Sequence, residues 1–144
     1  MPQSTGPKVS SAIARMQAQI DDGQVRAALA IYEQVAPHAT EGQWSESSLT
    51  NLIKALLDAR LWHESVPVMV HYLRTFSHND VRVRLKLAQV LIREVKRPGQ
   101  ALRVLARIPA NALPSDLETI RRKLEQQATK MQDEGELELE TEDW

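Results

Sequence analysis

The side chains that most often perform catalysis or bind metal ions are not spaced for either task in this sequence. The four histidines are His38, His63, His71 and His78, and no two lie three or four residues apart, the spacing that presents two ligands from one helix. The five glycines stand singly, so no loop cradles a phosphate, and no serine lies in a nucleophile elbow. Cysteine is absent, which excludes thiolate ligands and disulfides. We therefore predict no enzyme activity, no catalytic residue, no metal and no cofactor.

A run of basic residues is the strongest candidate for a binding function. Residues 81 to 107 contain eight Lys and Arg but only one acidic residue, Glu94. On a helix, Arg82, Lys86 and Arg93 align on one face between two apolar rows. Three interpretations stay open: a solvated face, a groove for an acidic peptide, or a nucleic-acid surface. The last is disfavoured because the net charge is −1 and no aromatic residue lies among the basic ones to stack on bases.

The chain ends in an acidic tail, residues 135–144. From residue 133 to 143 there are seven Asp and Glu and no Lys or Arg. One interpretation is a disordered, solubilising tail. The other is a tail that docks on the basic residues, of its own chain or of a neighbour, through Leu137, Leu139 and Trp144. An exposed ion pair contributes only about 0 to 1 kcal/mol, but tethering supplies an effective concentration on the order of millimolar.

Apolar periodicity predicts seven helices that position these segments. We expect them at about 9–22, 24–36, 46–59, 63–76, 80–96, 98–108 and 115–134. Gly23 is typical of a left-handed helix end, and Ser45 of a helix N-cap. Residues 77–80 and 115–118 match capping boxes. The sequence thus predicts an all-α protein with a disordered N-terminus (1–8), one helical domain (9–134) and the tail.

The sequence offers no segment for crossing or entering a membrane. Its start lacks a secretory pattern, and its apolar stretches are far shorter than the roughly 20 residues that span a bilayer. We predict a cytoplasmic protein without direct membrane insertion, while its oligomeric state stays open.

Three pairs of these helices repeat. Small residues fall inside the second helix of each pair at Ala28, Ser65 and Ala101, with separations of 65 − 28 = 37 and 101 − 65 = 36 residues. Large side chains follow each at four and seven residues. Residues 23–32 and 60–69 resemble the hairpin turn and second helix of tetratricopeptide repeats, whose period is about 34 residues. The Trp, Gly and Tyr usual in the family's first helix are missing here.

This resemblance covers roughly residues 9 to 108, and the seventh helix is similar to the family's capping helix. It implies an α-solenoid of three helical hairpins that acts as an adaptor or scaffold and binds a peptide segment. It also implies that Lys54, Lys86 and Arg93 line the concave groove with Arg82 at its edge. Members that clamp chaperone tails use paired asparagines, whereas only Asn51 comes close here, so chaperone binding is not predicted.

A second resemblance gives an alternative. Residues 61–69, 83–93 and 137–144 look similar to the soluble region that follows the membrane domain in some bacterial rhomboid-type proteins. The implied function is a regulatory domain of a larger membrane protein. The protease chemistry would then belong to another part, because no Gly-x-Ser-Gly nucleophile occurs in this sequence.

Overall fold

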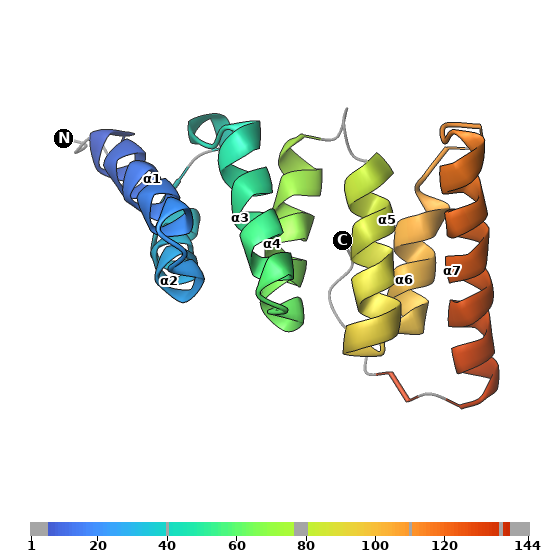
Figure 1. The fold of residues 1–144 in the computed structure, drawn as a ribbon. Coiled ribbons are helices and arrows are strands. Elements are labelled where there is room, and N and C mark those ends of the chain that lie inside the picture. Colours follow the sequence, from blue (N-terminus) through green and yellow to red (C-terminus); the bar gives the residue numbers. More distant parts are fainter. Residues whose placement is uncertain (1–5, 40, 77–80, 110, 136, 139–144) are drawn as a thin grey trace. The chain divides into compact units, whose positions relative to one another are not determined.

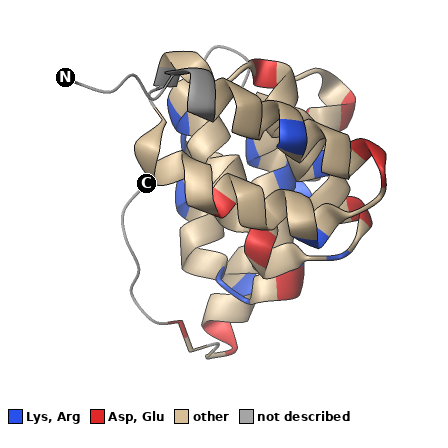
Figure 2. Ribbon diagram, turned by 90° about the vertical axis from the view of Figure 1, so that its left-hand side faces the viewer, with Lys and Arg blue, Asp and Glu red and all other residues tan. Residues whose placement is uncertain are grey.

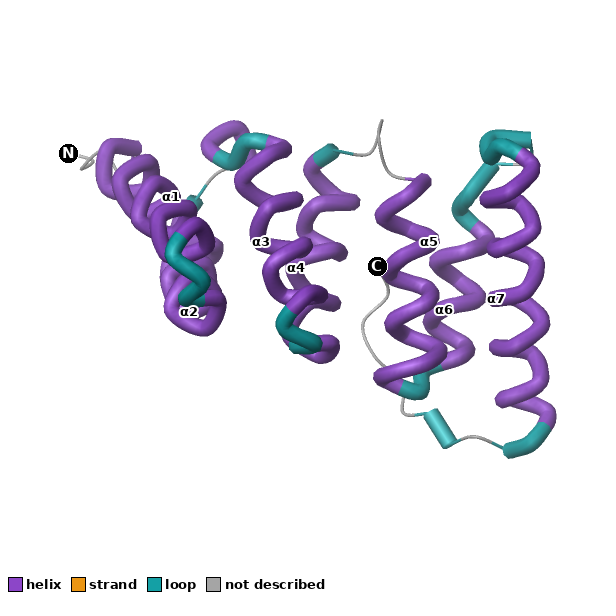
Figure 3. Tube along the Cα trace, viewed as in Figure 1, coloured by secondary structure: helices purple, strands orange, loops and turns teal. Residues whose placement is uncertain are grey.

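The computed structural model describes residues 6–39, 41–76, 81–109, 111–135 and 137–138. Within them the chain forms the helices α1 to α7 and three short helical turns, and no strand (Figures 1 and 3). The predicted all-α class is therefore confirmed. The chain divides into two compact units, Met1–Val68 and Met69–Trp144, called unit 1 and unit 2 below. The boundary falls inside α4 (Trp62–Thr75).

Unit 1 is built around a helical hairpin and a third helix. Its elements are α1 (Gly6–Asp21), α2 (Val25–Val35), the 3₁₀ turns η1 (Ala36–His38) and η2 (Glu41–Gln43), α3 (Glu46–Asp58) and the start of α4. Helix α1 packs against α2, and both contact α3. Ser45 is the N-cap of α3, as predicted, because its Oγ accepts the Ser48 amide at 3.1 Å. Tyr32 and Trp44 are buried with ring centroids 5.3 Å apart, which joins α2 to the approach of α3.

Unit 2 contains the remainder of α4 and three further helices. These are α5 (Val81–Val90), which continues as the π-helical turn η4 (Leu91–Val95), α6 (Pro98–Ala106) and α7 (Ser115–Asp133). Helix α6 packs on α5, η4 and α7, and α7 also contacts α5. Helix α7 buries only Leu124 and Ala128 among its residues, so one narrow stripe attaches it to the unit.

Several predicted helix ends are wrong. Helix α1 begins at Gly6, before the predicted start at residue 9. Helix α4 begins at Trp62, so Pro67 lies beyond the first turn. Residues 115–118 do not form the predicted capping box: Pro114 is the N-cap, no side chain caps the helix, and the Glu118 carboxylate binds Arg121 instead. The other predicted box, residues 77–80, lies outside the described residues.

A turn that reverses the chain ends α1, α3 and the continuous helix of α5 and η4, each time with a left-handed residue at its centre. Its central residue is left-handed at Gly23, Arg60 and Lys96, with φ of 77°, 60° and 60°. The separations, 60 − 23 = 37 and 96 − 60 = 36, are those found between the small residues of the sequence. Each turn lies five residues before a small residue with an exposed fraction of 0%: Ala28, Ser65 and Ala101. The backbone and the buried small residues therefore repeat in phase.

Candidate functional site

The basic residues predicted for binding on α5 and η4 are exposed. Apolar residues of this continuous helix are buried in two rows. Arg82, Lys86 and Arg93 are exposed on the remaining part of this helix. Figure 2 colours every described Lys and Arg blue and every described Asp and Glu red. We call Arg82, Lys86 and Arg93 the basic face. Lys86 Nζ donates to Gln89 Oε1 at 3.4 Å, which keeps this ammonium on the exposed side.

The basic face leads to the start of α6. In η4 the Lys96 amide donates to the Leu91 carbonyl, and the Arg97 amide reaches the same oxygen at 2.7 Å. The wide turn and the left-handed Lys96 end the helix and reverse the chain, so that α6 begins at Pro98. Arg93 lies in η4 and Lys96 in the reversing turn, and both are exposed. Basic residues thus recur along the chain from α5 to Arg97, the N-cap of α6, with the acidic Glu94 among them.

Lys54, the fourth predicted binding residue, belongs to unit 1. It is exposed on α3, one turn after Asn51. Asn51 Nδ2 donates to Gln17 Oε1 on α1 at 3.1 Å, and Gln17 Nε2 donates to Asp21 Oδ1 at 2.9 Å. Beside Lys54, the first helices of two successive predicted hairpins are therefore joined by a polar bridge.

The first turn of α6 holds a carboxylate that the sequence did not predict there. The Gly99 and Gln100 amides donate to the two oxygens of Glu138, at 2.6 and 2.9 Å. Pro98 has no amide hydrogen and Arg97 provides no side-chain cap, so Gly99 and Gln100 carry the amides that a cap ordinarily satisfies. The local signal was a helix that begins with Pro-Gly and has no capping side chain before it. Nothing in it pointed to residue 138.

The predicted tail-docking residues are only partly described. Leu137 has an exposed fraction of 84%, while Leu139 and Trp144 lie outside the described residues. Docking through these three side chains stays a prediction. The contact that the structure does contain is made by Glu138, which is half-buried beside Leu137.

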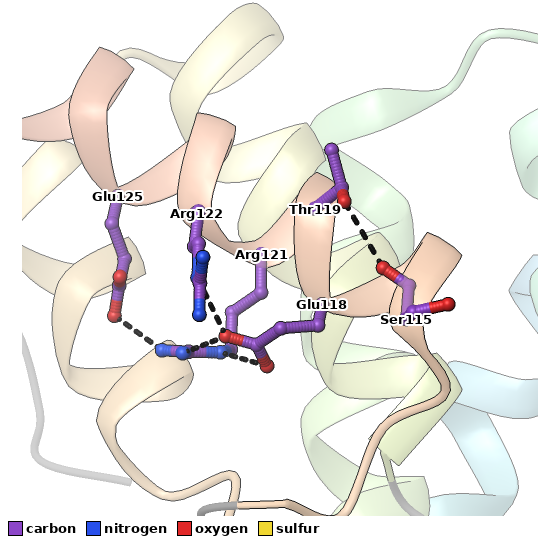
Figure 4. Close-up of polar contacts among 6 residues, drawn as sticks. All are labelled: Ser115, Glu118, Thr119, Arg121, Arg122 and Glu125. Atoms are coloured by element: carbon purple, nitrogen blue, oxygen red, sulfur yellow. Dashed lines mark hydrogen bonds and ion pairs between the residues drawn. The ribbon is translucent and has the colours of Figure 1, made fainter.

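Charged residues on α7 pair with one another along the helix (Figure 4). Arg121 binds Glu118 through Nε at 2.9 Å and through a second, shorter contact, and it reaches Glu125 Oε2 at 2.7 Å. Arg122 Nε donates to Glu118 at 3.2 Å. Hydrogen bonds from Arg121 hold the pKa of Glu118 below its ordinary value, and the same pairing raises the pKa of Arg121. These pairs stabilise a helix that buries little.

A shallow hollow of about 430 Å³ lies along α7 and includes two of these paired residues, Arg122 and Glu125. Its lining residues all belong to this one helix: Arg122, Glu125, Gln126, Thr129, Lys130 and Asp133. Two basic and two acidic side chains offset each other there, so the hollow has no preferred ligand charge. Among the described residues no three His, Asp or Glu side chains are grouped as a metal site would need.

The described helices include none with the length and apolarity needed to cross a bilayer. Comparison of the chain with protein-family models, with curated proteins and with solved structures finds no match. The candidate site is consequently defined by its own geometry: an exposed basic face and a helix start that binds a carboxylate, both in unit 2.

Proposed function

We propose that this protein is a non-catalytic binding module built from tetratricopeptide-like helical hairpins, and that it holds an acidic segment of another polypeptide. The observation that carries the proposal is the basic face of α5 and η4. A helix that buries two apolar rows has one exposed strip left, and here that strip carries Arg82, Lys86 and Arg93. An extended acidic peptide complements such a strip.

The recurring turns support the hairpin stack. In the proposed arrangement the hairpins are α1 with α2, α3 with α4, and α5 and η4 with α6. A small buried residue lies five positions after each left-handed turn, where it would let the two helices of each proposed hairpin approach closely. Helix α7 suits the capping role, because it buries a narrow stripe and turns a polar, internally paired face outward.

The test is binding of a fluorescein-labelled oligoglutamate peptide, followed by fluorescence anisotropy at low salt. Each exposed ion pair is worth about 0 to 1 kcal/mol, so we expect each of Arg82→Gln, Lys86→Gln and Arg93→Gln to weaken binding up to about fivefold. The triple variant should weaken it more than any single change. Added salt should lower the affinity of the wild-type protein.

The matched control is Arg26→Gln, which removes one exposed positive charge from α2 in unit 1. It should leave the affinity unchanged within about twofold, the size of a general charge effect. Equal weakening by Arg26→Gln and Lys86→Gln would show that only net charge matters. An unchanged affinity in the triple variant would remove the basic face as the binding surface.

A further inference from the structure

Two backbone amides in the first turn of α6 bind the Glu138 carboxylate of the tail in the way that such amides bind an anionic ligand. Glu138 lies 39 and 38 residues from its partners Gly99 and Gln100, so this is a returning chain and not a local helix cap. Each carboxylate oxygen has its own amide donor. Amides of a first helical turn favour a negative charge through both their orphan hydrogens and the helix dipole.

We infer that the first turn of α6 is a binding site for a carboxylate of a partner's acidic segment, and that Glu138 fills it as an internal competitor. This inference rests on the proposed function and names the place where one acidic side chain of the partner binds. The partner takes the place of Glu138, so binding is coupled to release of the tail.

A second observation in the same turn points to a ligand. The side chain of Gln100 is buried, with 3% of the residue exposed, and its Nε2 makes no hydrogen bond within the described part of the chain. A buried amide without an acceptor is disfavoured. The tail carboxylate accepts from the backbone amide of Gln100 and leaves this buried side-chain donor of the same residue unpaired within the described part of the chain.

Glycine at position 99 makes room for the carboxylate. A Cβ added there would lie 2.9 Å from Glu138 Oε1 and 3.1 Å from Gln132 Nε2. Glu138 therefore occupies the space that any other residue would fill with its own side chain. Gly99 has no left-handed backbone and lies within α6, so alanine fits the helix, and its Cβ would displace the Glu138 carboxylate and press on the end of the Gln132 side chain.

The surroundings fit an acidic peptide with more than one carboxylate. Arg93, the last residue of the basic face, and Lys96 are exposed on the chain that leads into α6. The tail sequence has acidic residues at alternate positions, 136, 138 and 140, with leucines between them. It is an example of the kind of segment that the site accepts. A partner segment that alternates acidic and apolar residues would place one carboxylate on Gly99 and others toward Arg93.

The experiment uses the full chain and a fluorescein-labelled peptide with the sequence of residues 135–144. Glu138→Gln weakens the internal competitor and leaves the site open. If the tail fills nine sites in ten, the peptide should bind this variant about tenfold more tightly than the wild type. Gly99→Ala and the double variant should bind it more weakly than Glu138→Gln by about tenfold or more, since the site is then blocked. Circular dichroism checks that each variant is folded.

The matched control is Glu134→Gln, which removes an equal charge just after α7. It should leave the affinity of the peptide unchanged. Equal tightening by Glu134→Gln and Glu138→Gln would overturn the inference, because it would show relief of general repulsion. Failure of Gly99→Ala to weaken binding to the Glu138→Gln variant would also overturn it.

The outcomes separate this inference from the proposed function. Weakening by Lys86→Gln but not by Gly99→Ala would keep the basic face and reject the α6 site. The reverse result would keep the α6 site and reject the basic face. Light scattering addresses another occupant: a concentration-dependent dimer that Gly99→Ala abolishes would overturn the inference in favour of a tail from a second copy of the chain.

Discussion

Replacing Gly23 by alanine tests the recurring turn directly. Gly23 has φ of 77°, and a Cβ added to it would meet no atom within 4 Å. The change therefore introduces no clash, and its cost is conformational. A left-handed conformation costs a residue with a Cβ about 1 to 2 kcal/mol. Alanine also lowers the conformational entropy of the unfolded chain, and this effect stabilises the folded protein by about 0.4 to 1 kcal/mol. We expect Gly23→Ala to lower the free energy of unfolding by about 1 kcal/mol.

Replacing Arg60, the central residue of the corresponding turn after α3, by glycine should change the free energy of unfolding in the opposite direction. The turn at Gly23 is closed by Gly23 N to Ile20 O at 3.0 Å and Gln24 N to Gln19 O at 2.8 Å. The turn at Arg60 has the same pair of bonds, from Arg60 N to Leu57 O at 3.0 Å and from Leu61 N to Leu56 O at 2.9 Å. Both are Schellman motifs. Because both turns have the same hydrogen bonds and a left-handed central residue, Arg60→Gly should raise the free energy of unfolding by up to about 1 kcal/mol.

Urea denaturation followed by circular dichroism measures both changes in the free energy of unfolding. The slope of this free energy against urea concentration should stay the same in each variant if the same unfolding transition is observed. Gly42→Ala is the control, because Gly42 also faces open space and has no positive φ. Its effect should stay within about 0.5 kcal/mol. A Gly23→Ala variant as stable as the wild type, or an Arg60→Gly variant less stable than it, would refute the argument that the two turns are conformationally equivalent.

Two further predictions concern the packing of unit 2 and the charges on α7. Ala101→Leu should lower the free energy of unfolding by about 1 to 3 kcal/mol, because the residue is fully buried on α6, whereas Ala106→Leu, exposed on the same helix, should change it little. Denaturation measures this, and equal effects of the two would refute close packing at Ala101. The folded pKa of Glu118 is lowered, so its stabilising effect is present above its ordinary pKa of 4.5 and is lost as the pH falls through the folded value. Glu118→Gln should therefore be less stable than the wild type at neutral pH, with the difference between their urea midpoints shrinking toward pH 3. A difference that stays constant with pH would contradict this.

The helices could be predicted from the sequence because their signals are local. Gly23 and Ser45 mark ends whose partners lie within five residues, and the structure contains the expected left-handed end and N-cap at these positions. The capping box at residues 115–118 failed because the Glu118 carboxylate has a competing partner in Arg121, and charge-assisted hydrogen bonds are the stronger ones. The π-helical end of α5 also escaped prediction, since apolar spacing does not distinguish one wide turn from the α-helix that it extends.

The part of the candidate site that lies within one helix could be predicted from the sequence, and the part that joins distant segments could not. The exposure of Arg82, Lys86 and Arg93 follows from the two apolar rows on the same helix. The carboxylate on α6 does not follow from any short pattern, because the chain between residues 100 and 138 must fold before Glu138 can return to Gly99. A pattern of charges indicates that opposite segments attract each other, but only the fold selects which amides receive the carboxylate.

The repeat explains why a single hairpin carries this site. Subtracting the repeat lengths from Gly99 gives the corresponding positions in the other two proposed hairpins, 99 − 36 = 63 and 63 − 37 = 26, which are His63 and Arg26. All three are the second residue of their helices, and each follows a turn with a left-handed central residue. His63 and Arg26 each have a Cβ, whereas a Cβ added at Gly99 would lie 2.9 Å from Glu138 Oε1. One missing side chain in a repeated backbone therefore makes the third hairpin different, and the same glycine lies where the chain leaves the basic face. A partner's acidic segment would be fixed at this end and would run from it over Arg93 toward Arg82.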